Sequence, residues 1–116
     1  MTKITLFQRA SDAISYAAGE VIFNEGDPAE VMYVLIEGEV EILHHGQVID
    51  RVGTGSLIGE MALLEATPRS ATARARTDCR LVPINEKRFL FLVQQTPFFA
   101  LQVMRIMSER LRRRIQ

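Results

Sequence analysis

Glycines divide the first half of this chain into short segments. They stand at Gly19, Gly26, Gly38, Gly46, Gly53 and Gly55. The segments between them include β-branched and aromatic runs such as Val21-Ile22-Phe23, which favour strands. Short strands joined by turns at this spacing are typical of an all-β sandwich or barrel.

The individual strands follow from apolar content and alternation. Ile14 and Tyr16 alternate with Ser15, and the five clearest strands are expected at Val31 to Ile36, Val40 to His44, Gln47 to Val52, Ser70 to Ala75 and Cys79 to Ile84. Glu37-Gly38-Glu39 and His45-Gly46 are predicted to be hairpin-like turns. Small and charged residues alternate from Thr72 to Arg76, so Arg74 and Arg76 are expected to face solvent. The pattern at Ile4 to Phe7 fits either a strand or a helical turn.

The apolar period changes after Pro83. Asn85 is a good N-cap, and Phe89, Leu92 and Val93 recur at helical spacing, which predicts an amphipathic helix from Glu86 to Gln95. Thr96-Pro97 is a second helix start, and a second helix is expected from Phe98 to about Ile115. With 116 residues and 47% apolar content, we predict one domain, 1–116, with a β-roll over about 13–84 and two C-terminal helices at 86–95 and 98–115.

The second helix carries two apolar stripes. Val103, Ile106 and Met107 form one, and the other comprises Leu101, Met104, Ser108, Leu111 and Ile115. One stripe can pack on the roll, and the other would then need a partner, of which a second copy of this helix is the simplest. The alternative is that both stripes cover the core of the roll. The sequence does not choose between them, so a homodimer through the C-terminal helix stays open.

One stretch of the chain, the cassette run, has the composition of an anion-binding site. It reads Gly59-Glu60-Met61-Ala62-Leu63-Leu64, then Glu65-Ala66-Thr67, then Pro68-Arg69-Ser70-Ala71-Thr72. Gly59 permits a close backbone approach, and one short helical turn after it would present amides without intrahelical partners. Pro68 ends that turn. Arg69 adds a planar cation suited to the two free oxygens of a phosphodiester, and Glu60 adds an acceptor for hydroxyls. A site that binds an anion and also accepts hydrogen bonds from hydroxyl groups suits a sugar phosphate.

This run resembles the phosphate-binding cassette of the cyclic nucleotide-binding domain, the module of the catabolite activator protein and of protein kinase A regulatory subunits. The upstream segments Gly19-Glu20-Val21-Ile22-Phe23-Asn24-Glu25-Gly26-Asp27 and Tyr33-Val34-Leu35-Ile36-Glu37-Gly38-Glu39-Val40 are similar to the other signature of that family. The resemblance covers nearly the whole chain. It implies a double-stranded β-helix, a jelly-roll-like β-roll, followed by helices.

The resemblance also implies roles for individual residues. Arg69 would pair with the cyclic phosphate of cAMP or cGMP, helped by Ser70 and by the amides of Met61 and Ala62. Glu60 would accept from the ribose 2′-hydroxyl near the Gly59 carbonyl, with Ile58, Leu63 and Val52 as the apolar wall and Ala71 completing the site. Ile58 stands where the family commonly has Phe, and Ser70 where it commonly has Ala, which blurs the choice between cAMP and cGMP.

Five arginines make the end of the second helix basic: Arg105, Arg110, Arg112, Arg113 and Arg114. Such a cluster usually belongs to a solvated face that complements the helix dipole. In the resembled family the last helix folds over the base as a lid, and Arg110 and Arg114 share one face at a spacing of four. We therefore consider Arg110 and Arg114 as lid residues that stack on a purine.

Composition and residue types narrow the function further. The net charge is zero, from 14 basic and 14 acidic side chains, so no overall field attracts nucleic acid or an acidic membrane. No apolar run approaches the roughly 20 residues of a membrane span. Cys79, the only cysteine, suits a reducing cytoplasm and is expected to be a core residue. We therefore expect a cytoplasmic protein that binds neither nucleic acid nor a membrane.

Enzymatic and metal functions are not expected. The chain has only two histidines, His44 and His45, and neighbours on a strand point to opposite faces, so they should not share a metal site. No Ser, His and acid arrangement is evident, and Glu60 beside an arginine suits hydrogen-bond acceptance better than proton abstraction. The sequence thus predicts a cyclic nucleotide-binding regulatory module that, lacking an effector domain, acts through a separate and unidentified effector protein. The alternative is an assembly module of the same fold that no longer responds to a nucleotide.

Overall fold

The computed structural model describes residues 1–115, without the side chains of residues 114 and 115. Eight strands form two four-stranded antiparallel sheets. One has the order β1-β8-β3-β6 and the other β2-β7-β4-β5. The strands are β1 (Ile14–Tyr16), β2 (Val21–Phe23), β3 (Val31–Glu37), β4 (Val40–His44), β5 (Gln47–Val52), β6 (Leu57–Ile58), β7 (Thr72–Ala75) and β8 (Cys79–Asn85).

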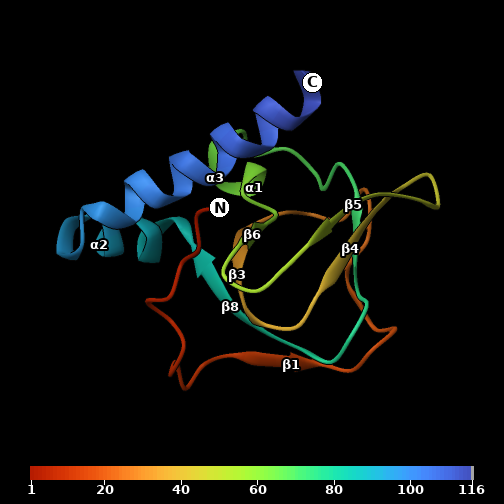
Figure 1. The fold of residues 1–116 in the computed structure, drawn as a ribbon, viewed down its shortest axis with the longest axis horizontal. Helices are drawn as coiled ribbons and strands as arrows, with labels where there is room; N and C mark the ends of the chain where they lie inside the picture. The colour runs from red at the N-terminus through yellow and green to blue at the C-terminus, as the bar shows by residue number, and fades with distance from the viewer. Residues whose placement is uncertain (116) are drawn as a thin grey trace.

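The described residues also form three helices: α1 (Met61–Leu64), between β6 and β7, and α2 (Glu86–Gln95) and α3 (Phe98–Ile115), after β8. Asn85 caps α2 by accepting a hydrogen bond from the Arg88 amide at 2.8 Å, as expected from the sequence. In Figure 1, α3 runs along one side of the roll, next to α1 and β6, with α2 at its N-terminal end. The fold is therefore mainly β with C-terminal helices, which confirms the predicted class.

Most element bounds agree with the sequence prediction, and the exceptions have local causes. β7 begins at Thr72 instead of Ser70, because the chain at Arg69 still bonds to the loop after β2. The two-residue strand β6 was not predicted, since Leu57 and Ile58 show no periodicity and become a strand only by pairing with β3. Residues 4–7 form neither a strand nor a helix, and Ile4 and Phe7 are buried.

The central pair β3 and β8 is covered on both faces. On one face, Met32 and Val34 pack with Val82 and Ile84 against helix residues such as Phe99. On the other face lies the interior of the roll, where the buried residues are Leu35, Val40, Val52, Ile58, Ala73, Ala75, Cys79 and Leu81. Two contiguous cores therefore share these strands, and the cassette connects them.

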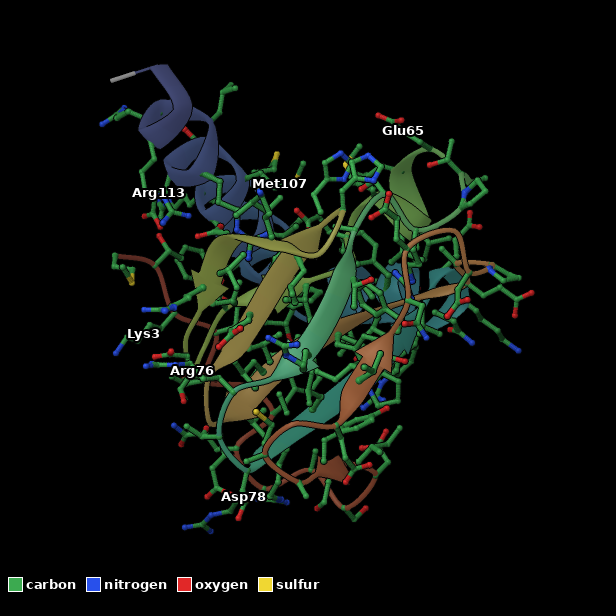
Figure 2. The ribbon with its side chains drawn as sticks, turned by 90° about the vertical axis from the view of Figure 1, so that its right-hand side faces the viewer. Lys3, Glu65, Arg76, Asp78, Met107 and Arg113 are labelled. Carbon is green, nitrogen blue, oxygen red and sulfur yellow. The ribbon has the colours of Figure 1, made fainter. Side chains whose placement is uncertain are left out.

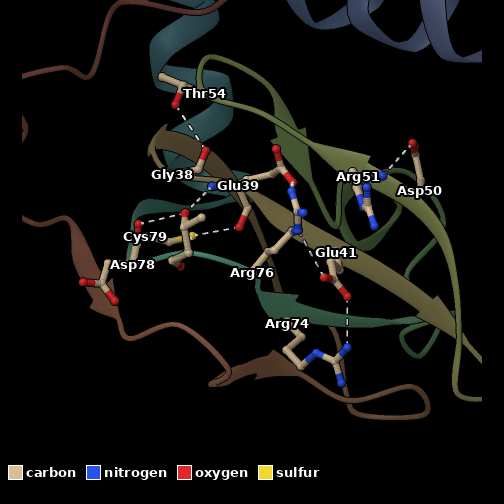
Figure 3. A network of polar contacts seen from close by, with 11 residues as sticks. Gly38, Glu39, Glu41, Asp50, Arg51, Thr54, Arg74, Arg76, Asp78 and Cys79 are labelled. Carbon is tan, nitrogen blue, oxygen red and sulfur yellow. Dashed lines mark hydrogen bonds and ion pairs between the residues drawn. The ribbon is translucent and has the colours of Figure 1, made fainter.

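The outer face of β4 and β7 carries a charged network (Figure 3). Arg74 bonds to Glu41 at 2.9 Å, and Arg76 pairs with both Glu39 and Glu41. Both arginine side chains are more than 40% exposed, which confirms the predicted solvent-facing position. Cys79 lies just inside this network, and burial raises the pKa of its thiol. Cys79 is thus a core residue, as predicted.

The two apolar stripes of α3 have different surroundings. Phe99, Val103 and Ile106 are buried against the roll, whereas Leu101, Met104 and Leu111 are exposed. Of the two alternatives, the one in which both stripes cover the core is therefore wrong.

Among the described residues no single helix has the length and hydrophobicity of a membrane span. Helices α2 and α3 reach that length and hydrophobicity only when they are taken together, and they are bent by 117° at the break between them.

Candidate functional site

A cavity of about 590 Å³ lies between the cassette, the β4-β5 hairpin and the end of α3. Nearly all predicted site residues line it: Ile58, Gly59, Glu60, Met61, Ala62, Arg69, Ser70, Ala71 and Arg110, with Val52 on the wall. The lining combines the buried cation of Arg69, two further arginines, two carboxylates and an apolar wall; the carboxylates are those of Asp50 and Glu60. Residues as far apart in sequence as Phe23 and Arg113 meet here because the roll closes and α3 packs on it.

Arg69 is the only charged residue among those buried in the described chain, with 8% of its surface exposed. Its guanidinium donates to the carbonyls of Gly59 at 3.2 Å and Val31 at 2.7 Å. It also lies 4.0 Å from the centre of the Phe23 ring, a cation–π contact. No carboxylate pairs with it in the described chain, and its Nε has no hydrogen-bond partner there.

The environment of Arg69 is therefore unfavourable for a cation without an anion. Burial lowers the pKa of Arg69, and nearby Tyr33 and Asp27 oppose this shift. A buried charge costs free energy unless it is paired, so an anion in the cavity would stabilise this arginine. The main chain holds it in place, because its amide donates to Asp27 at 2.9 Å and its carbonyl accepts from Gly26 at 2.7 Å.

Gly59 has to be a glycine for two reasons. Its φ is +72°, and a Cβ added there would lie 2.4 Å from Nη1 of Arg69. The close backbone approach predicted from the sequence is therefore an approach to the arginine itself. After it, Met61–Leu64 forms the single helical turn that was expected.

Two expectations for the cassette do not hold. The Ala62 amide donates to the Gly59 carbonyl at 3.2 Å, so it is not an orphan donor. Leu63 does not line this cavity; it packs on the core between the roll and the helices and borders a separate hollow with Met32 and Phe89. A four-residue helix turns Leu63 away from the side on which Ala62 and Met61 face the cavity.

Glu60 lies beside an arginine, but its partner comes from the other end of the chain. Nη1 of Arg110 donates to Glu60 at 2.8 Å, and Nη2 of the same arginine donates to Ser56 at 3.0 Å and to the Leu57 carbonyl. Both side chains of the ion pair are largely buried. Arg110 therefore connects α3 to the cassette and to β6.

The end of α3 borders the cavity through two arginines, Arg110 and Arg113. Arg113 lines the cavity and pairs with Asp50 of β5 at 3.4 Å, and Figure 2 shows it near the end of α3. The side chain of Arg114, the other predicted lid residue, lies outside the described residues. Stacking of Arg110 on a base stays a prediction.

Sequence reasoning missed several residues that line the cavity. Phe23 stacks over Arg69. The cavity is also lined by Ala29, Ile42, Ile49, Asp50 and Arg113, and by Thr67 and Pro68 of the cassette run. Ile42 alternates within a predicted strand, which was a signal for an inward position. Thr67 and Pro68 lie within the cassette run, and the remaining residues carry no local signal, because their approach to the cassette depends on how the sheets close and how α3 packs.

The expectation that His44 and His45 point to opposite faces is wrong. His45 has a φ of +50° and lies in the turn, so the two rings come within 4.0 Å of each other, centre to centre. Both Nδ1 atoms lie within 4 Å of the Glu25 carboxylate. The alternation rule fails where a strand ends in a left-handed turn.

Comparison with known proteins agrees with this geometry. The family model of the cyclic nucleotide-binding domain matches residues 13–96, and the chain belongs to that family. Over 82 residues it is 37% identical to the cAMP-dependent protein kinase regulatory subunit of Emericella nidulans, covering 69% of this chain and 20% of that protein.

Two solved structures show the same fold. The Thermus thermophilus catabolite activator protein is 32% identical with a TM-score of 0.74, covering 89% of this chain and 52% of that one. The c-di-GMP responsive global regulator CLP of Xanthomonas campestris is 30% identical with a TM-score of 0.78. The match covers 90% of this chain and 56% of that one. This chain thus spans a fifth to about half of the length of these relatives.

Proposed function

We propose that this chain is a regulatory module that binds a cyclic purine nucleotide, cAMP in the first place and cGMP as the alternative, without changing it chemically. The observation that carries the proposal is Arg69, a buried cation that lines the cavity, lacks an ion-pair partner in the described chain and has an unpaired Nε. A cyclic phosphate would supply the missing anion. Glu60 on the same cavity would accept from the ribose 2′-hydroxyl.

The choice of base depends on residues beyond the cassette. The phosphate and ribose are common to cAMP and cGMP, so discrimination has to come from groups that reach the base. Ser70 is exposed to the cavity and offers a hydroxyl to a guanine amino group. We expect a modest preference for cAMP, with Ser70→Ala weakening cGMP more than cAMP.

The signal would pass to a separate effector protein, in the cytoplasm, where the single free Cys79 is suited to reducing conditions. The exposed stripe of α3, with Leu101, Met104 and Leu111, supports a homodimer through this helix. We expect no catalysis, no resident metal for the nucleotide and no nucleic-acid or membrane partner. The second candidate, an assembly module without ligand, would leave the buried Arg69 without an anion, which is why we rank it lower.

Calorimetric titration with cAMP, cGMP and c-di-GMP tests the proposal, because one relative responds to the dinucleotide. The wild type should bind one cyclic mononucleotide per site. Arg69→Ala should lose on the order of 2 to 5 kcal/mol of binding free energy, because it removes a charged bidentate contact. Arg74→Ala removes a cation from the outer face and serves as the matched control.

Thermal melts separate loss of binding from loss of fold, since Arg69 also satisfies the carbonyls of Gly59 and Val31. Arg69→Lys keeps the charge and tests the geometry of the guanidinium. Binding of none of the three ligands to folded wild type would favour the assembly module. Equal affinity of wild type and folded Arg69→Ala would place the nucleotide elsewhere.

A further inference from the structure

Glu25, His44 and His45 gather at an edge of the roll outside the nucleotide cavity. One ring nitrogen of each histidine and one carboxylate oxygen of Glu25 all lie within 4.8 Å of one another. Nδ1 of His44 is 3.6 Å and Nδ1 of His45 is 3.9 Å from the same oxygen, Oε2 of Glu25. Two imidazoles and a carboxylate that converge in this way form a set of three metal-ligand side chains.

The hairpin between β4 and β5 brings the two rings together. His44 pairs with Gln47 across the hairpin, so His45 and Gly46 alone form the turn. His45 has a φ of +50° and Gly46 a φ of +80°, the left-handed conformation that two-residue turns require. A non-glycine residue is uncommon there, and this conformation directs both imidazoles to the same side.

Glu25 is oriented by hydrogen bonds of its own. Its amide donates to Oγ1 of Thr72 at 2.9 Å, which holds the main chain of the loop between β2 and β3. Its Oε1 accepts from the His45 amide at 3.3 Å, so Oε2 is the oxygen turned toward both rings. Hydrogen bonds that orient a ligand side chain are a regular feature of protein metal sites.

We propose that Glu25, His44 and His45 bind a divalent transition metal ion of the zinc class. In tetrahedral coordination at about 2.0 to 2.1 Å, ligand atoms lie ~3.3 Å apart. The two nitrogen–oxygen pairs, at 3.6 and 3.9 Å, exceed this by about 0.3 and 0.6 Å, and the two ring nitrogens lie within 4.8 Å of each other, so the exposed side chains would move closer together around the ion. Imidazole nitrogen favours Zn²⁺ over the oxygen-seeking Ca²⁺ and Mg²⁺. The side chains are 32% exposed at Glu25, 48% at His44 and 78% at His45, which leaves room for water as a fourth ligand.

The ion would connect two segments that lie far apart in the sequence. His44 and His45 belong to the β4-β5 hairpin, and Glu25 belongs to the loop whose next residues, Gly26 and Asp27, bond to the main chain of Arg69. Because the ion would bind the folded arrangement and not the unfolded chain, it should raise the melting temperature in a concentration-dependent way.

The test uses the whole chain without an affinity tag, stripped with EDTA and then titrated with ZnCl₂ by calorimetry. We expect one Zn²⁺ per chain, and at least about tenfold weaker binding in His44→Ala, His45→Ala and Glu25→Gln, since even outer-shell partners are worth 10- to 100-fold. Glu30→Gln, an exposed carboxylate in the same loop, is the matched control and should bind Zn²⁺ like the wild type. Absorption of the Co²⁺ complex would show a low-symmetry nitrogen and oxygen site in the wild type and lose intensity in the three variants.

Melting temperatures provide the second measurement. In EDTA the three variants should melt close to the wild type, because the side chains lie at the surface, and Zn²⁺ should raise the melting temperature of the wild type and of Glu30→Gln only. Absence of stoichiometric binding by the wild type would overturn the proposal. It would equally be overturned if His44→Ala and His45→Ala bound Zn²⁺ as tightly as the wild type.

Discussion

At the scale of single residues, the site depends on two arginines that bond to different parts of the cassette. Arg69 is held under Gly59 and beside Phe23, whereas Arg110 reaches Glu60 from α3. Glu60 thus has one oxygen engaged with Arg110 before any ligand binds. The carboxylate is held in place by this ion pair, which suits the proposed role of presenting an acceptor to a ribose hydroxyl.

The first prediction at this scale concerns Glu60→Gln. The amide oxygen can still accept from a 2′-hydroxyl but without charge assistance, so the loss of cAMP affinity should be about 1 kcal/mol and smaller than for Arg69→Ala. Calorimetry with cAMP and 2′-deoxy-cAMP on wild type and variant measures it. On the variant, removal of the 2′-hydroxyl should cost little more.

Glu65→Gln is the control, because Glu65 is an exposed carboxylate that follows α1 (Figure 2). If the affinity losses caused by Glu60→Gln and by removal of the 2′-hydroxyl were fully additive, Glu60 would not bond to the ribose hydroxyl.

At the scale of elements, the turn between β3 and β4 is packed closely against main-chain atoms. Gly38 has a φ of +102°, and an added Cβ would lie 2.4 Å from the carbonyl oxygen of Asp78 and 2.7 Å from Sγ of Cys79. Figure 3 shows Gly38 next to Cys79 at this end of the roll. Gly19 has a similar φ of +92°, but an added Cβ meets nothing within 4 Å.

We therefore predict that Gly38→Ala lowers the free energy of unfolding by about 1 to 3 kcal/mol more than Gly19→Ala does. Both variants pay the cost of a left-handed backbone, and only Gly38→Ala adds a steric overlap with main-chain atoms. Urea unfolding of the two variants and the wild type gives the difference. If both variants lost the same free energy, the backbone conformation alone would account for the effect, and the close packing of this turn would have no energetic weight.

At the scale of the whole molecule, α3 has two different faces. Phe99, Val103 and Ile106 belong to the core, while Met104 and Leu111 are 57% and 61% exposed. Leu101, Met104, Ser108 and Leu111 follow each other at spacings of three and four, the pattern that packs helix against helix. The same helix carries Arg110 and Arg113 to the cavity, so the proposed dimer contact and the proposed nucleotide site would share one element.

The prediction at this scale is that the wild type dimerises and that Met104→Glu shifts it toward the monomer, because a charge in an apolar helix contact is costly to desolvate. Light scattering after size-exclusion chromatography, over a range of protein concentrations, measures the mass. Val48→Glu places the same charge at an exposed apolar residue of β5 and should leave the mass unchanged. A wild type that stays monomeric at every concentration would show that the outer stripe is not a dimer contact.

The sequence by itself determined most of the elements and the position of the cassette. The predicted bounds of β4, β5, α2 and α3 are those of the structure, because hydrophobic period, turn residues and helix caps are properties of neighbouring residues. Most of the site residues predicted in the run from Gly59 to Ala71 line the cavity, except for Leu63, which the short helix turns into the core. Their roles toward a ligand stay predictions.

Only the tertiary structure decided which distant residues meet. Strand β6 exists through its pairing with β3, Phe23 reaches Arg69 across the closed roll, and Arg110 reaches Glu60 from 50 positions away. The position of His45 beside His44 depends on a left-handed turn, and that of Glu25 on a bond between two loops. These contacts form when the roll closes and α3 packs on it, and no local pattern in the chain records a distance between segments that are far apart in sequence.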